Sequence, residues 1–135
     1  MAVLADTGVL YALADRDDAW HARTRAYLKK SRPALIVPVT VVPEVTYLLR
    51  ARLGRAAEGA FVKSLAAGEM ALEDITGEDL ARAVALMSAY PEIGFVDASV
   101  VALAERLRVR QIATTDRRHF AAIRPQHAPS FELLP

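Results

Sequence analysis

The sequence contains no cysteine, no long hydrophobic run and no marked excess of charge of either sign. The lack of cysteine excludes disulfides, thiolate metal sites and a cysteine nucleophile, and it is typical of a reducing compartment. No apolar run reaches the ~18 residues that a membrane span needs. The opening segment, MAVLAD, lacks the basic region and apolar core of a signal peptide. We therefore expect a cytoplasmic protein without a membrane segment.

What is present is a composition suited to a folded core. The chain has 135 residues, of which 53% are hydrophobic, and 17 Lys and Arg residues against 16 Asp and Glu give a net charge of +1. This length predicts a single domain over residues 1–135. The near balance of charge does not by itself indicate a nucleic-acid binder.

Short apolar or alternating runs are separated by segments with helical periodicity. The runs predict strands at residues 2–5, 35–37, 69–75, 111–115 and 130–133. The periodic segments predict helices at residues 7–14, 17–31, 40–54, 56–67, 76–90 and 97–107, with a brief helical turn after Asp116. Thr40 is expected to cap its helix, and Thr76 with Asp79 resembles a capping box. Strands that alternate with helices predict an α/β fold with a mostly parallel central sheet.

Four acidic residues differ from the others because their neighbours are apolar. Asp6 and Asp116 each lie where an expected strand meets a helix, and Glu44 and Asp97 each lie in the first turn of an expected helix. An aspartate after a strand is often only the cap of the next helix. In open α/β sheets, however, ligands bind at the carboxyl ends of the strands. The remaining acids are expected on the solvated surface.

Four carboxylates gathered at one edge of a sheet would repel one another, and their pKa values would rise. A hard divalent cation removes this repulsion, and Mg²⁺ or Mn²⁺ prefers oxygen ligands. Such a cluster suits hydrolysis of a phosphodiester assisted by metal ions. Without the four acids, 12 acidic residues remain against 17 basic ones, a balance of +5 that suits a phosphate backbone.

Other catalytic patterns are missing. None of the histidines is paired with another at helical spacing, and there is no G-x-S-x-G elbow, phosphate-binding loop or dinucleotide fingerprint. Thr7 and Thr115 adjoin key acids, and either hydroxyl is a candidate to orient a carboxylate. Candidate substrate contacts follow Asp116 in the chain, namely Arg117, Arg118 and His119. The single tryptophan, Trp20, is expected in the core.

Four segments together resemble a known family. They are LADTGVLYALAD, VPVTVVPEVTYLL, GFVDASVVALAERL and IATTDRRHF, and they resemble the acidic signatures of the PIN domain, more narrowly of the toxin half of VapBC toxin–antitoxin pairs. The motifs run from residue 4 to residue 120 in the family's order. The resemblance implies a three-layer α/β/α domain and an endoribonuclease that depends on Mg²⁺ or Mn²⁺. It also implies a homodimer and inhibition by a cognate antitoxin.

The resemblance places the family's acids on Asp6, Glu44, Asp97 and Asp116, and the residue after the first acid on Thr7. Three alternatives stay open: a PIN-type nuclease in RNA processing, a dehalogenase-type phosphatase and a receiver-type phosphotransfer domain. A fourth, an RNA-binding or scaffold domain, would be expected to lack one of the acids, and all four are present. The phosphatase needs D-x-D, but Gly8 occupies the second position. The receiver expects adjacent acids after the first strand and a late lysine, and this sequence has neither.

Overall fold

All 135 residues are described by a computed structural model, in which one sheet of five parallel strands is flanked by helices. The spatial order of the strands is β3-β2-β1-β4-β5. The strands are β1 (Ala2–Ala5), β2 (Ala34–Pro38), β3 (Ala71–Glu73), β4 (Gln111–Ala113) and β5 (Glu132–Leu134). The α/β prediction is therefore confirmed, and the sheet is parallel throughout.

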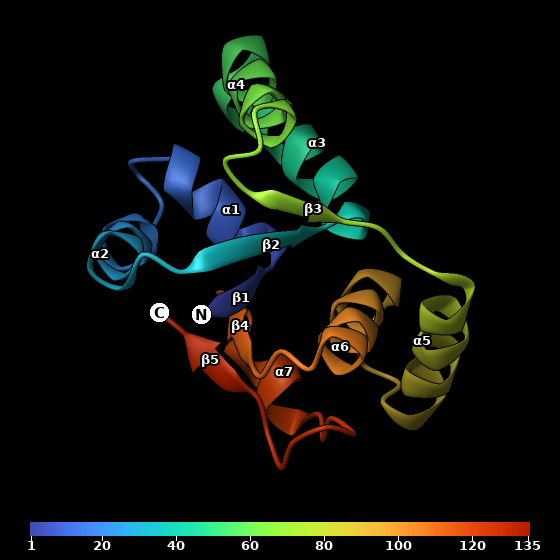
Figure 1. The fold of residues 1–135 in the computed structure, drawn as a ribbon. Coiled ribbons are helices and arrows are strands. Elements are labelled where there is room, and N and C mark those ends of the chain that lie inside the picture. The colour runs from blue at the N-terminus through green and yellow to red at the C-terminus, as the bar shows by residue number, and fades with distance from the viewer.

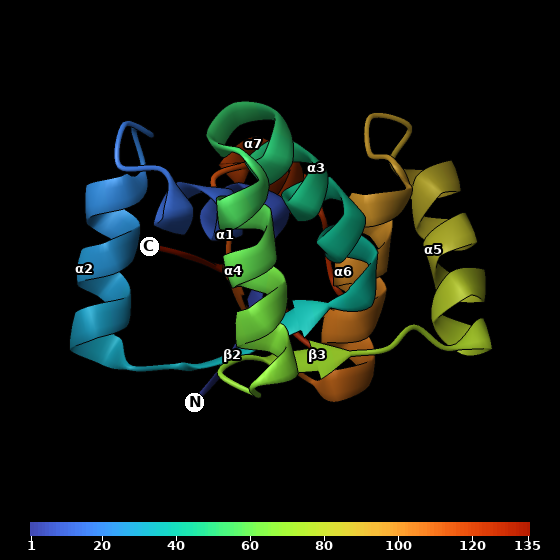
Figure 2. The same cartoon turned by 90° about the horizontal axis from the view of Figure 1, so that it is seen from above.

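Helices cover both faces of the sheet, as Figures 1 and 2 show, with α1 and α2 on one side and α5 and α6 on the other. The helices are α1 (Thr7–Ala14), α2 (His21–Ser31), the 3₁₀ turn η1 (Val39–Val41), α3 (Val42–Leu53), α4 (Arg55–Ala66), α5 (Gly77–Ala89), α6 (Phe95–Leu107) and α7 (Arg117–Ala122). None of them combines the length and the apolar character needed to cross a membrane.

The core lies around β1 and α6. Val3, Leu4 and Ala5 are fully buried because β1 is a central strand with helices on both faces, which is why this strand is apolar at every position. In α6 the whole segment of residues 98–104 is buried. Such a helix has no solvated stripe over that length, and its N-terminal turn, which carries Asp97, directly precedes the buried segment.

The register of β1 against β4 creates the edge at which the acids meet. Leu4 pairs with Ile112 and Ala5 with Ala113, so both strands end at the same level. The backbone N–H of Asp6 donates to the carbonyl of Ala113 at 2.9 Å. Residues 6 and 114–116 therefore emerge side by side at the carboxyl edge of the sheet.

Two predicted helix starts are wrong. The second helix begins at His21 and not at residue 17, because Asp15 and Asp18 accept hydrogen bonds from the backbone N–H groups of Asp17 and Trp20 and hold them in a turn. Thr40 is not a helix cap, since α3 begins after η1 with no side-chain cap. Its hydroxyl instead lies 2.6 Å from the Ser99 hydroxyl.

The two outer strands are shorter than, or shifted from, their predicted ranges. β3 covers only residues 71–73 of the predicted 69–75, and β5 is displaced by one to two residues toward the C-terminus. Both lie at the edges of the sheet and have one neighbour each. The capping box of α5 is confirmed: the Thr76 hydroxyl accepts from the N–H of Asp79, and the Asp79 carboxylate accepts from the N–H of Thr76.

Candidate active site

Asp6 is the most deeply placed of the four acids. It follows β1 directly and is only 5% exposed. Its carboxylate makes no cap hydrogen bond to α1 and instead accepts one from the Thr114 hydroxyl at 2.9 Å. Burial raises the pKa of Asp6, and the nearby carboxylates of Asp116 and Glu44 raise it further, against lowering by hydrogen bonds from Thr7 and Thr114. Asp6 is therefore more than a helix cap.

Asp97 lies in the first turn of α6 and is not its cap, since Gly94 holds that position. Burial is the main cause that raises the pKa of Asp97 to about 6, and the carboxylates of Asp6 and Asp116 contribute in the same direction. His119 opposes them. The charges that act on Asp97 come from Asp6 after β1, from α3 and from the start of α7, so the fold brings together acids that are far apart in the chain.

Glu44 reaches the group from α3. The side chain is exposed, and its Oε1 accepts a hydrogen bond from the Thr7 hydroxyl at 2.8 Å. Its charge raises the pKa values of both Asp6 and Asp97. The predicted supporting role of Thr7 therefore has a geometric basis, because Thr7 orients Glu44.

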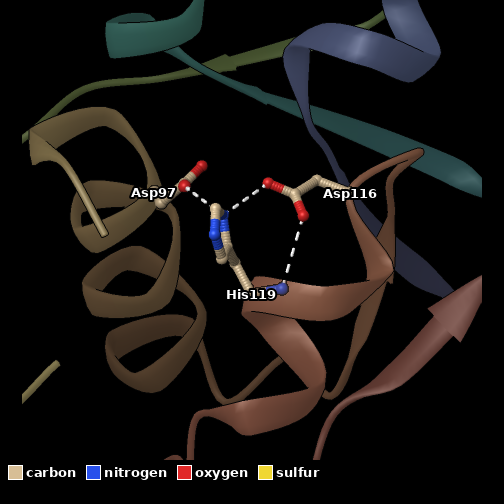
Figure 3. A group of neighbouring side chains, drawn as sticks. All are labelled: Asp97, Asp116 and His119. Carbon is tan, nitrogen blue, oxygen red and sulfur yellow. Dashed lines mark hydrogen bonds and ion pairs between the residues drawn. The ribbon is translucent and has the colours of Figure 1, made fainter. Parts of the chain in front are cut away.

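Asp116 is the N-cap of α7 and binds the helix through its carboxylate. One oxygen accepts from the backbone N–H of His119 at 3.3 Å, and the other lies 2.8 Å from His119 Nδ1. The same imidazole nitrogen lies 3.7 Å from Asp97 Oδ2. Figure 3 shows the His119 ring between the two carboxylates.

Two hydroxyl residues beside the acids or beside Thr40, namely Thr114 and Ser99, were not predicted from the sequence. Thr114, not Thr115, donates to Asp6, and it also accepts from the backbone N–H of Asp116. The period-2 alternation of a strand was the available signal, because it turns residues 114 and 115 to opposite faces. The second missed residue is Ser99, which is fully buried beside Thr40 and donates to the carbonyl of Val96.

Thr115 instead packs against the start of α1. A Cβ atom added at Gly8 would lie 2.0 Å from Thr115 Oγ1 and 3.2 Å from the Thr115 Cβ. The two residues are therefore in close contact.

We expect Gly8→Ala to destabilise the fold by about 1–3 kcal/mol, as overpacking usually does. It should also displace the adjoining Asp116 and lower activity. Chemical denaturation measures the first effect, and Gly8→Ala combined with Thr115→Ala should recover part of it. No gain from the second substitution would contradict the contact.

The candidate substrate residues lie around this edge in different environments. Arg117 donates to the carbonyl of Pro135 and places its guanidinium 5.4 Å from the Trp20 ring centroid. Arg118 is exposed, whereas His119 faces the acids. Trp20 is not a core residue, because it is only half-buried and also has Arg23 4.6 Å from its ring.

The four carboxylates fit a divalent cation. They supply only oxygen donors. The pKa values of Asp6 and Asp97 are both raised by burial and by the neighbouring carboxylates. This is the electrostatic cost that a bound cation removes. The arrangement defines an α/β domain whose acidic edge suits metal-assisted hydrolysis.

Comparison with known proteins identifies the family. The family described as PIN domain matches residues 3–124. Ribonuclease VapC26 of Mycobacterium tuberculosis is 36% identical over 135 residues, which cover 98% of this chain and 100% of that protein. The chain therefore belongs to the PIN-domain family, and within it to the VapC group. This membership decides against the receiver and phosphatase alternatives.

Solved structures agree with this fold. The crystal structure of Mycobacterium tuberculosis VapC20, described as a sarcin-ricin loop cleaving toxin, has a TM-score of 0.81 at 24% identity and covers 89% of this chain and 94% of that chain. A toxin–antitoxin complex from Klebsiella pneumoniae has a TM-score of 0.71 at 22% identity, with 90% and 92% covered. At these identities the likeness establishes the architecture.

Proposed function

We propose that this protein is a VapC-type toxin, an endoribonuclease that hydrolyses RNA phosphodiesters in the cytoplasm through a Mg²⁺ or Mn²⁺ site. The proposal takes residues 1–135 as one PIN-like domain. The observation that carries it is the convergence of Asp6, Glu44, Asp97 and Asp116 at one edge of a parallel sheet, with two of the pKa values raised. The 36% identity to a protein named as a ribonuclease supports the same activity.

Each residue has a distinct part in the proposed site. Asp6 is the buried ligand and Asp97 the half-buried one, Glu44 is the exposed ligand oriented by Thr7, and Asp116 closes the group from α7. A divalent cation, when bound, supplies activation of the attacking water and stabilisation of the leaving oxygen. The protein contributes preorganisation, because Thr114 hydrogen-bonds both to Asp6 and to the backbone of Asp116.

The test is cleavage of RNA with Mg²⁺, with Mn²⁺ and with EDTA. We expect cleavage with either metal and none with EDTA, because the bound cation supplies the activation of water. The products should carry 5′-phosphate and 3′-hydroxyl ends, as expected when water attacks in line. Products that end in 2′,3′-cyclic phosphate would show that the ribose 2′-hydroxyl is the nucleophile and would contradict the proposal.

The proposal includes an antitoxin partner and a homodimer. The helices that follow Thr40 and Gly54 carry the apolar residues Val41, Val45, Leu48, Phe61 and Leu65, but Val41 and Val45 are fully buried in the core and cannot receive a partner helix. Phe61 does line an apolar groove between α1, α3 and α4. Its lining residues are Leu10, Leu13, Ala14, Leu49, Ala57, Ala60, Phe61, Ser64 and Met70. An amphipathic helix of the antitoxin would dock its apolar face there.

A basic tail on that helix would approach the acidic edge. An Arg or Lys among the carboxylates supplies the positive charge that a cation otherwise supplies, so the two compete. We expect antitoxin binding, measured by calorimetry, to weaken as Mg²⁺ rises and to weaken in Asp97→Asn. Phe61→Ala should weaken binding at every Mg²⁺ concentration. Affinity that depends on Phe61 but on neither metal nor Asp97 would show that inhibition works by covering the groove alone.

A further inference from the structure

The His119 imidazole lies among the site carboxylates, in contact with two of them. Nδ1 lies 2.8 Å from Asp116 Oδ2 and 3.7 Å from Asp97 Oδ2. The ligand atoms offered by Asp97, Asp116 and His119 all lie within 4.8 Å of one another. In Figure 3 the ring points into the space between the two carboxylates, away from the body of α7. His119, which its position in the sequence made a candidate substrate contact, therefore faces the proposed metal site.

The separations match neighbouring ligands on one ion. With metal–ligand distances of about 2.1 Å in an octahedral shell, adjacent ligand atoms lie about 3.0 Å apart. The two distances from His119 Nδ1, 2.8 Å and 3.7 Å, fall on either side of this value. All three donor atoms lie within 4.8 Å of one another, so a cation that binds all three would draw the side chains closer together.

The protonation chemistry of the ring also allows coordination. A neutral imidazole carries its proton on one nitrogen and offers a lone pair on the other. The His119 side chain is 35% exposed, so Nε2 can hold the proton while Nδ1 faces the carboxylates. The hydrogen bond between Nδ1 and Asp116 is then replaced by coordination of both groups to the cation.

We propose that His119 is a nitrogen ligand of this metal site and that it makes the site prefer Mn²⁺ over Mg²⁺. The inference rests on the proposed function of the same site. Mg²⁺ favours oxygen ligands and gives up its waters reluctantly, whereas imidazole nitrogen is a good ligand for transition-metal ions. A shell of carboxylates with one imidazole therefore gains more for Mn²⁺ than for Mg²⁺.

The test compares His119→Asn with His21→Asn in the full-length protein. Asparagine places an amide near the former Nδ1 position, so His119→Asn keeps a hydrogen bond to Asp116 but loses the imidazole ligand. His21→Asn is the matched control, because His21 Nδ1 lies 2.7 Å from the Ala12 carbonyl and plays the same hydrogen-bonding part outside the site. Two readouts are used without RNA: calorimetric titration with Mn²⁺ and with Mg²⁺, and electron spin-echo modulation of bound Mn²⁺, which detects a directly bonded nitrogen.

We expect the wild type and His21→Asn to show the signal of a bonded nitrogen, and His119→Asn to lose it. The Mn²⁺ affinity of His119→Asn should fall about 10-fold or more, the size of loss seen when support of a metal site is removed, while its Mg²⁺ affinity stays within about 2-fold. An unchanged nitrogen signal, or equal losses for both metals, overturns the role of His119 alone. If Mn²⁺ binding is undetectable, or survives in Asp97→Asn, the proposed metal site itself is overturned.

Discussion

Asp97→Asn should abolish RNA cleavage and at the same time make the metal-free protein more stable. The substitution keeps the size of the side chain but removes its negative charge. Burial, together with the Asp6 and Asp116 carboxylates, raises the pKa of Asp97 to about 6, so this charge is unfavourable in the metal-free protein. The loss of rate should exceed about 100-fold, the upper range for residues that only support metal ligands. The gain in the free energy of unfolding at pH 7 should be about 1 kcal/mol, because solvent reduces the effect at a side chain that is 23% exposed.

The pH dependence of stability follows from the same raised pKa. Between the ordinary value of 3.8 and about 6, the folded protein holds a proton on Asp97 that the unfolded chain releases. The stability of the metal-free wild type should therefore decrease as pH rises through this window, and the decrease should be smaller in Asp97→Asn. Chemical denaturation of both proteins at several pH values between about 4 and 7 measures both slopes.

A matched control separates loss of a ligand from loss of any charge. Asp17→Asn removes one carboxylate from an exposed turn and keeps the hydrogen bond that the Asp17 backbone donates to Asp15. It should leave cleavage and stability unchanged. Full activity in Asp97→Asn would reject the assignment of the site, and an equal loss in Asp17→Asn would show that the effect is not local.

Asp79→Asn should have the opposite profile, a large loss of stability with cleavage by the folded fraction unchanged. Asp79 is 3% exposed, accepts from the Thr76 backbone and receives Arg106 Nε at 3.1 Å on both oxygens. The substitution removes the buried negative charge that Arg106 Nε contacts, while Arg106 keeps Glu73 and the Asp74 carbonyl as partners, and it should cost about 2–4 kcal/mol. None of the four site acids is hydrogen-bonded to Asp79, so the chemistry should persist.

The measurement is urea denaturation, with cleavage assayed well below the unfolding temperature. Burial alone would raise the pKa of Asp79, but hydrogen bonds from Arg106 and Thr76 outweigh it and lower the pKa below the ordinary value of 3.8. The stability that this residue contributes is therefore present above that value and is lost in stronger acid. Glu78→Gln, an exposed neighbour in the same turn, is the control and should change little. A folded Asp79→Asn protein without cleavage would give Asp79 a part in the site.

Much of the fold was predictable because local rules and tertiary packing agree. A fully apolar β1 and an α6 with seven consecutive buried residues leave few alternatives to a central strand and a central helix. The predictions failed where side chains compete for backbone groups. Asp15 and Asp18 hold the residues before α2 in a turn, and Thr40 bonds to Ser99 instead of capping a helix. Partners 59 residues apart are invisible to a local pattern.

The sequence by itself determined the α/β class, the four acids and their positions at the ends of strands and the starts of helices. These properties follow from short-range periodicity and from charges placed among apolar neighbours. Only the tertiary structure decided which hydroxyl serves Asp6, where His119 points and which residues of α3 remain free. Each of these depends on the parallel register of β1 with β4 and on the packing of α6 and α7 beside them, which bring together groups separated by up to 108 residues.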